Sequence, residues 1–163
     1  MTRKQVLKSV GLSLAALGLG AGWAKAAETG AEKFEVTKTD AEWKALLSPA
    51  AYDTLRHEGT ERPGSSALLN EHRKGVFNCA GCDLALYDSD TKFESGTGWP
   101  SFFDHLPDAI NTKDDTSLFG DRTEVHCRRC GGHLGHVFDD GPKPTGLRYC
   151  MNGVALKFAP VAA

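Results

Sequence analysis

The chain has 163 residues, of which 40% are hydrophobic, 25% charged and 9% aromatic, and its formal net charge is −2. These fractions are typical of one compact globular domain and exclude a disordered, fibrous or polytopic membrane protein. Residues 1–26 contain four of the 19 basic side chains and no acidic one, so the remaining 15 basic and 21 acidic side chains give a net charge of −6. An acidic remainder without a cluster of Lys or Arg argues against nucleic-acid binding.

The start of the chain has the organisation of a secretory signal peptide. Residues 1–8 are short and basic, and residues 10–20 are apolar but too short to span a bilayer. Ala24-Lys25-Ala26 follows as a small-x-small cleavage site. The basic start also resembles the twin-arginine export consensus, with Lys4 in place of the second arginine. The alternative is an amphipathic N-terminal helix. We expect cleavage after Ala26 and a location outside the cytoplasm, in a bacterial periplasm.

Two short helices are predicted near the start of the mature chain. Asp40 can cap the first helix. The second helix is predicted over residues 50–57 and is stopped by Gly59. The first helix is indicated by apolar residues at helical spacing, which are Trp43, Leu46 and Leu47.

From Glu61 onwards the pattern changes to short apolar or β-branched pieces between turn residues. This punctuation is typical of a small antiparallel β domain. The predicted strands cover residues 75–78, 84–87, 123–126, 134–138 and 154–158.

Four of the five cysteines form two Cys-x-x-Cys pairs, Cys79 with Cys82 and Cys127 with Cys130. A two-residue spacer lets both sulfurs of a pair bind one ion, so two pairs predict a tetrahedral zinc site. Four protein ligands leave no open position, and such an ion is structural. The alternative is two disulfides or a redox-active pair, which an oxidising compartment favours.

Cys150 is the remaining cysteine, and it is a nucleophile, an intermolecular link or a buried core residue. Arg148 and Asn152 lie two residues to either side, so on a strand they share a face with the sulfur. A nearby guanidinium favours the thiolate, and an amide can orient a polar substrate. His133 and His136 are candidates for further donors.

Together these motifs resemble the B-type methionine sulfoxide reductases, which reduce the R epimer of methionine sulfoxide in proteins. The resemblance covers about residues 38–158, so we expect residues 27–163 to form a single reductase domain. It implies a mainly β fold of two small antiparallel, barrel-like sheets with short N-terminal helices. The resemblance rests on the two cysteine pairs, Gly98-Trp99-Pro100-Ser101-Phe102, His133-Leu134-Gly135-His136-Val137-Phe138 and Arg148-Tyr149-Cys150-Met151-Asn152.

The resemblance also implies a role for each site residue. One zinc ion binds Cys79, Cys82, Cys127 and Cys130. Cys150 attacks the sulfoxide sulfur and becomes a sulfenic acid, and His136 with His133 supplies the proton that the leaving oxygen needs. The resemblance further implies substrate contacts from Trp99 and Phe102, and a hydrogen-bond network shaped by Arg148, Asn152 and Asp140.

Many members of this family carry a second, resolving cysteine where this chain has Thr97. We therefore expect an external thiol to reduce the sulfenic acid, from a thioredoxin-like protein, a glutaredoxin-like protein or a small thiol. The expected substrates are oxidised proteins or peptides, and we expect a monomer without nucleic acid or stable membrane insertion. The alternatives are a non-catalytic zinc-ribbon interaction module and a thiol-disulfide oxidoreductase that uses one cysteine pair.

Overall fold

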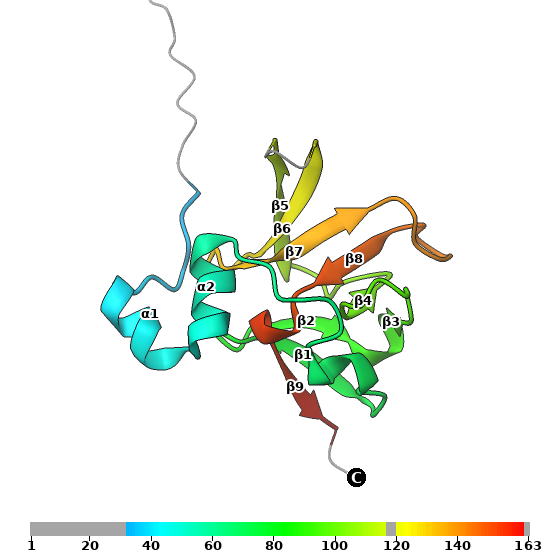
Figure 1. Cartoon of the computed structure of the whole chain (residues 1–163), viewed down its shortest axis with the longest axis horizontal. Coiled ribbons are helices and arrows are strands. Elements are labelled where there is room, and N and C mark those ends of the chain that lie inside the picture. Colours follow the sequence, from blue (N-terminus) through cyan, green and yellow to red (C-terminus); the bar gives the residue numbers. More distant parts are fainter. Residues whose placement is uncertain (1–31, 117–119, 162–163) are drawn as a thin grey trace, which may run out of the picture. The chain divides into compact units, whose positions relative to one another are not determined.

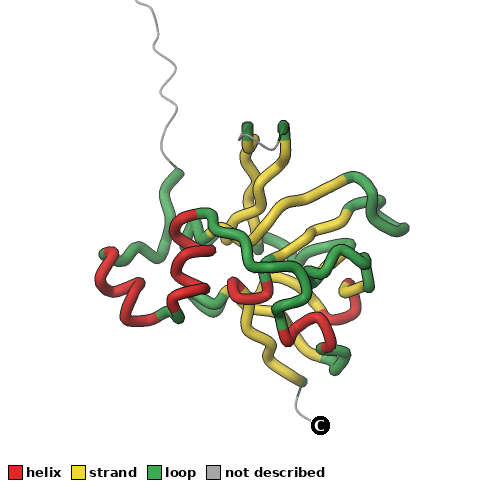
Figure 2. The backbone as a smooth tube through the Cα atoms, viewed as in Figure 1, coloured by secondary structure: helices red, strands yellow, loops and turns green. Residues whose placement is uncertain are grey.

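A computed structural model describes residues 32–116 and 120–161, so the predicted signal peptide lies outside the described residues. The described chain forms two antiparallel sheets preceded by two short helices (Figure 1 and Figure 2). This architecture confirms the predicted mainly β fold with short helices near its start. None of the helices in residues 32–116 and 120–161 is long and apolar enough to cross a membrane.

The two helices are α1 (Asp40–Leu46) and α2 (Pro49–His57). The predicted cap of the first helix is wrong by one residue, because Thr39 rather than Asp40 is the N-cap. The side chains of Thr39 and Glu42 each accept a hydrogen bond from the other's backbone N–H, which forms a capping box. Asp40 is instead the first helical residue, where a negative charge interacts favourably with the helix dipole.

The smaller sheet has three strands in the order β2–β1–β9, with β1 in the middle. The predicted strands at 75–78 and 84–87 are confirmed to within one residue. The predicted strand at 154–158 is wrong in its first part, because that part belongs to a 3-10 turn, η3 (Gly153–Ala155). The strands are β1 (Gly75–Cys79), β2 (Ala85–Asp88) and β9 (Leu156–Pro160).

The larger sheet has six strands in the order β3–β4–β8–β7–β6–β5. The predicted strands at 123–126 and 134–138 correspond to β6 and β7. Strand β5 was not predicted, because its sequence INTKDD is rich in residues that are depleted in strands. Two further 3-10 turns are η1 (Ala67–Asn70) and η2 (Ser89–Thr91). The strands are β3 (Lys92–Phe93), β4 (Ser101–Phe102), β5 (Ile110–Asp115), β6 (Arg122–Cys127), β7 (His133–Phe138) and β8 (Arg148–Met151).

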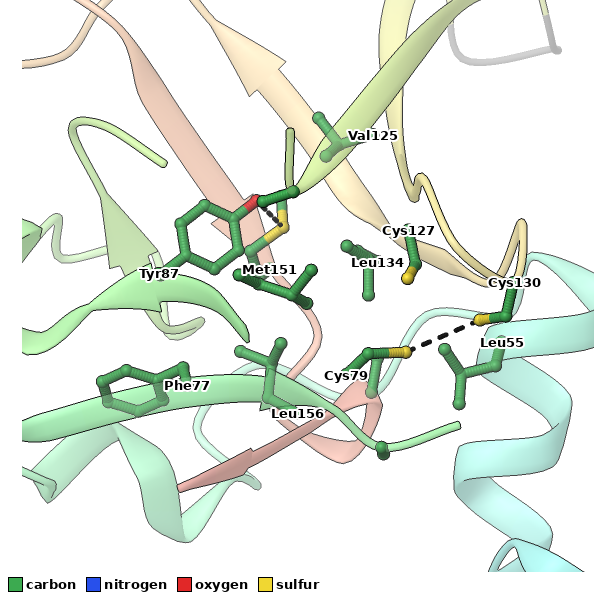
Figure 3. Close-up of a cluster of buried hydrophobic side chains, with 14 of the residues drawn as sticks. Leu55, Phe77, Cys79, Tyr87, Val125, Cys127, Cys130, Leu134, Met151 and Leu156 are labelled. Atoms are coloured by element: carbon green, nitrogen blue, oxygen red, sulfur yellow. Dashed lines mark hydrogen bonds between the residues drawn. The ribbon is translucent and has the colours of Figure 1, made fainter. Parts of the chain in front are cut away.

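The core lies between the two sheets and is built around three aromatic rings. Phe102 of β4 stacks on Tyr87 of β2 with ring centroids 4.3 Å apart, and its centroid lies 4.9 Å from that of Phe77 on β1. The Tyr87 hydroxyl donates a hydrogen bond to the Met151 sulfur of β8 at 3.0 Å (Figure 3). These contacts join both sheets through side chains that exclude water.

The two cysteine pairs come together where β1 and β6 end. Their four sulfur atoms lie within 4.8 Å of one another, and Cys82 Sγ lies 3.5 Å from Cys127 Sγ. Figure 3 shows Cys79 and Cys130, whose sulfur atoms are 3.7 Å apart. A tetrahedral zinc ion with bonds of about 2.3 Å requires sulfurs about 3.8 Å apart, whereas a disulfide requires about 2.05 Å. The four thiols therefore fit a structural zinc ion, as predicted.

Removal of the zinc is expected to unfold the domain. Structural zinc contributes on the order of 10 kcal/mol in small metal-bound domains, comparable with the total stability of about 5–15 kcal/mol. Cys79→Ser should therefore abolish zinc binding and the cooperative thermal transition, measured by metal analysis and calorimetry. Cys150→Ser is the matched control, because it removes a thiol outside the cluster and should keep one zinc ion per chain. A Cys79→Ser protein that melts like the parent would contradict a structural ion.

Candidate active site

Strand pairing places Cys150 beside His136. The Cα partners of Cys150 on β8 are His136 on β7 and Ser101 on β4. Residues directly opposite each other in antiparallel strands project from the same face, so the thiol and the imidazole share a face of the larger sheet. Gly135 permits this close pairing, because a Cβ there would lie 2.1 Å from the Cys150 carbonyl oxygen.

A pocket of about 160 Å³ opens over this face of the sheet. Four residues singled out by sequence line it together, namely Cys150, His136, Trp99 and Asn152. The pocket is smaller than the roughly 300–1,000 Å³ typical of drug-sized ligands, so it suits a group the size of one side chain. Its lining is completed by Thr60, Arg122, Gly135 and Phe138.

Glu61, which is not part of any sequence motif, connects two walls of the pocket. Its carbonyl oxygen accepts from Trp99 Nε1 at 3.1 Å, and its N–H donates to Asn152 Oδ1 at 3.0 Å. Its side chain also accepts from the N–H of Gly153. A single glutamate in a loop has no local pattern that could have revealed these contacts, since all of its partners are distant in sequence.

Asn152 is held on both sides of its amide. Its Oδ1 accepts from Glu61 and its Nδ2 donates to the Leu134 carbonyl oxygen at 3.1 Å, and the residue is only 4% exposed. Because buried amide groups of this kind fix the surrounding backbone, Asn152 positions the strand end that follows Cys150.

The two histidines approach each other through an irregularity in the sheet. Residues three apart on a regular strand face opposite sides, but the pairing of β6 with β7 shifts register between Val125 and His126. His133 and His136 consequently lie with ring centroids 5.4 Å apart. His136 lines the pocket of Cys150, whereas His133 faces a neighbouring cavity.

Each histidine is bonded to a carboxylate. His133 Nδ1 lies 2.8 Å from Glu124 Oε1, and His136 Nε2 lies 2.9 Å from Asp115 Oδ2. Burial lowers the pKa of His136 below its usual value of 6.5, and the hydrogen bond with Asp115 opposes that change. The neutral imidazole therefore predominates at neutral pH.

Arg148 and Asp140 form a bidentate ion pair beside the pocket. Arg148 Nε and Nη2 donate to the two Asp140 carboxylate oxygens at 2.7 and 2.8 Å. The Arg148 guanidinium lies 4.2 Å from the centroid of the Phe138 ring, which is a pocket wall. The Asp140 carboxylate, and to a smaller extent Cys150, raises the pKa of Arg148. The guanidinium thus keeps a positive charge near the thiol and supports Phe138.

Phe102 does not line the pocket. It is fully buried, and its ring faces the aromatic core. Successive residues of β4 point to opposite faces, so that Ser101, the partner of Cys150, lies on the pocket side and Phe102 on the core side. The structure therefore places Phe102 in the core behind the sheet, where its ring stacks on Tyr87.

Thr97, where many family members carry a resolving cysteine, lies next to Cys150. Thr97 Oγ1 lies 3.7 Å from Cys150 Sγ. Ser95 Oγ lies 2.8 Å from Thr97 Oγ1 and 2.7 Å from Ser101 Oγ, so the three hydroxyls form a hydrogen-bonded chain next to the thiol. Hydroxyls can bond a sulfenic acid but cannot reduce it.

A larger polar cavity of about 510 Å³ adjoins the pocket, with His136 in both linings. Its charged residues are not among the candidates that the sequence motifs indicate. Arg122 and Glu124 alternate on β6, which is a signal that could have revealed them, whereas Asp115 lies on the strand that was not predicted. The cavity is lined among others by Thr60, Asp115, Arg122, Glu124, His133 and His136.

Comparisons with known proteins agree with this geometry. The SelR domain family matches residues 47–160. The chain is 57% identical over 124 residues to peptide methionine sulfoxide reductase MsrB of Methanosarcina barkeri, which covers 76% of this chain and 87% of that protein. It is 52% identical to the proteins of the same name from Leptospira interrogans over 126 residues and from Pseudomonas putida over 128, each covering 77% of this chain and 96% of the relative.

Among solved structures, a Mis18 'Yippee-like' domain covers 56% of this chain and 100% of its own, with a TM-score of 0.46 and 19% identity. The match to the SelR domain spans most of the chain, and the curated relatives are matched over nearly their whole length. The chain therefore belongs to the B-type methionine sulfoxide reductases, the family of the SelR domain.

Proposed function

We propose that Cys150 is the nucleophile with which this protein, a peptide-methionine (R)-S-oxide reductase, reduces methionine-R-sulfoxide in oxidised proteins to methionine. The observation that carries the proposal is the pocket that unites Cys150, His136 and Trp99. It combines a thiol, a titratable donor and an aromatic wall in a space of side-chain size. Reduction of oxidised methionine restores an apolar side chain, so the activity is one of protein repair.

The reaction needs a thiolate, a proton donor and groups that bind and orient the substrate. The Cys150 thiolate attacks the sulfoxide and takes over its oxygen as the S–O bond of the substrate breaks, while one proton from His136 goes to that oxygen. Methionine leaves in the reduced form and Cys150 becomes the sulfenic acid. Two external thiols then return Cys150 to the thiol, with formation of one disulfide and one water.

The pocket walls match the substrate side chain. The ring of Trp99 offers an apolar surface to the terminal methyl group and tolerates the neighbouring sulfur. Its indole is held by the hydrogen bond to Glu61, so that its orientation costs little entropy on binding. Phe138 is a second aromatic wall, and the Arg148 guanidinium, paired with Asp140, packs on its ring.

The reductant is an external thiol, because no other described cysteine lies outside the zinc cluster. We assign this role to a thioredoxin-like protein, a glutaredoxin-like protein or a small thiol. The two alternatives are not favoured. An oxidoreductase would need one cysteine pair free to cycle, but both pairs converge on one metal site, and a mere interaction module has no need of a free thiol beside a histidine.

Cys150→Ser is expected to abolish the reaction while the fold remains intact. With dithiothreitol and a peptide whose methionine sulfoxide epimers have been separated, the parent should reduce the R epimer alone. The serine variant should form no methionine, because an alkoxide is not available at neutral pH. Zinc content and the melting temperature should match those of the parent, since Cys150 is outside the metal cluster. Methionine formation by the serine variant would remove Cys150 from the mechanism.

Thr97→Cys is expected to create an internal disulfide during turnover. The present separation of 3.7 Å between Thr97 Oγ1 and Cys150 Sγ lies close to the distance that a thiol must cross to attack a sulfenic acid. Mass spectrometry after one turnover should detect a link between positions 97 and 150. Ser95→Cys is the matched control, and it should form no disulfide with Cys150. Unlinked protein from Thr97→Cys would show that the loop holds position 97 out of reach.

We also propose that the protein is exported to a periplasm after removal of residues 1–26. The support is the order of basic, apolar and small-residue segments in this region. Protein recovered from the periplasm of an expressing bacterium should begin at Ala27 by N-terminal sequencing. Ala24→Phe should retain the first segment, because the cleavage site requires small residues. Full-length parent protein confined to the cytoplasm would refute export.

A further inference from the structure

A charged network adjoins His136 in the polar cavity next to the pocket of Cys150. Asp115 at the end of β5 and Arg122 at the start of β6 are Cα partners, and Arg122 Nη2 donates to Asp115 Oδ2 at 2.7 Å. The same carboxylate oxygen lies 2.9 Å from His136 Nε2. Asp115 is thus held by a cation on one strand and contacts an imidazole on another.

The contact with Asp115 engages one particular nitrogen of His136. An ionised carboxylate only accepts hydrogen bonds, so Nε2 must carry a hydrogen. The second nitrogen, Nδ1, is then the one that gains and loses a proton. His136 lines both the pocket of Cys150 and the polar cavity that Asp115 lines, so its ring borders the thiol and the carboxylate alike.

We propose that Asp115 is a positioning residue for the reduction, which holds the His136 ring and keeps Nε2 protonated so that Nδ1 delivers the proton to the sulfoxide oxygen. The inference rests on the proposed function and deepens it. After the transfer, His136 is left neutral with its hydrogen on Nε2, and Asp115 remains ionised throughout. The carboxylate thus acts through the imidazole and never touches the substrate.

The charged groups around His136 determine in which direction each substitution should change its pKa. The imidazole is faced by Asp115 from β5, by Arg122 and Glu124 from β6, by His133 on its own strand and by Cys150 from β8. Asp115 favours the protonated imidazole, whereas Arg122 disfavours it. Loss of Asp115 should therefore lower the pKa of His136, and loss of Arg122 should raise it.

The test measures methionine formation in a single turnover, without reductant, as a function of pH. For the parent and for every variant that retains His136, we expect the proton-dependent part of the rate to fall as pH rises through the pKa of His136. In Asp115→Asn this fall should move to lower pH, and the rate on the alkaline side should drop about tenfold for each unit of change in pKa. In Arg122→Gln the fall should move to higher pH. His136→Gln should lack the proton-dependent part altogether.

Asp114→Asn is the matched control, because it removes the same charge from the neighbouring position. Asp114 is exposed and borders the same polar cavity, but the hydrogen bond to His136 comes from Asp115. Its profile should equal that of the parent, and Asp115→Glu should restore the parent profile in part. An NMR titration of the His136 ring measures its pKa directly, and a merely structural role of Asp115 would leave that pKa unchanged.

The outcomes separate this inference from the function on which it depends. If the folded, zinc-bound parent reduces neither epimer, the proposed function fails. If the parent reduces the R epimer but Asp115→Asn and Asp114→Asn share its pH profile and His136 pKa, Asp115 has no positioning role. Should Asp115→Asn fail to fold, an Arg122→Gln profile that is unchanged or moved to lower pH overturns the inference.

Discussion

The convergence of four cysteine thiolates on one zinc ion joins the two sheets of this protein, and the geometry of the pocket depends on it. Cys79 ends the middle strand of the smaller sheet, and Cys127 ends β6 of the larger one. Cys130 lies in the turn that leads into β7, which carries both histidines. Four thiolates leave no free coordination position. The ion therefore contributes to folding energy and positions β7 without entering the chemistry.

The larger sheet separates the apolar core from the reactive groups. On β8, Tyr149 and Met151 are buried between the sheets, while Cys150 between them faces the pocket. Strand alternation thus places a reactive thiol on a rigid, well-packed support. The same alternation on β4 assigns Ser101 to the pocket side and Phe102 to the core side. A rigid support of this kind suits the proposed reaction, in which a nucleophile and a proton donor act on the same substrate group.

The polar groups around the pocket are held by partners from distant segments. Glu61 joins Trp99 to Asn152, and Asp115 joins Arg122 to His136. Buried or half-buried polar side chains are stable only when hydrogen-bonded, so each of these contacts also fixes an orientation. The protein thereby holds its reactive side chains in place before substrate arrives.

Sequence alone determined which residue types form the metal site and the candidate active site, because the motifs that indicate them are local. Two Cys-x-x-Cys pairs favour a zinc site by their spacing, and a single remaining cysteine near Arg148 and Asn152 indicates a candidate nucleophile. The short apolar or β-branched pieces between turn residues indicate strands. Tertiary structure alone decided which side chains meet. Strand β5 has poor intrinsic strand propensity and forms through its pairing with β6, so Asp115 could not be placed beside His136 in advance. The register shift that brings His133 to His136, and the burial of Phe102, likewise follow from packing between segments, which no local pattern encodes.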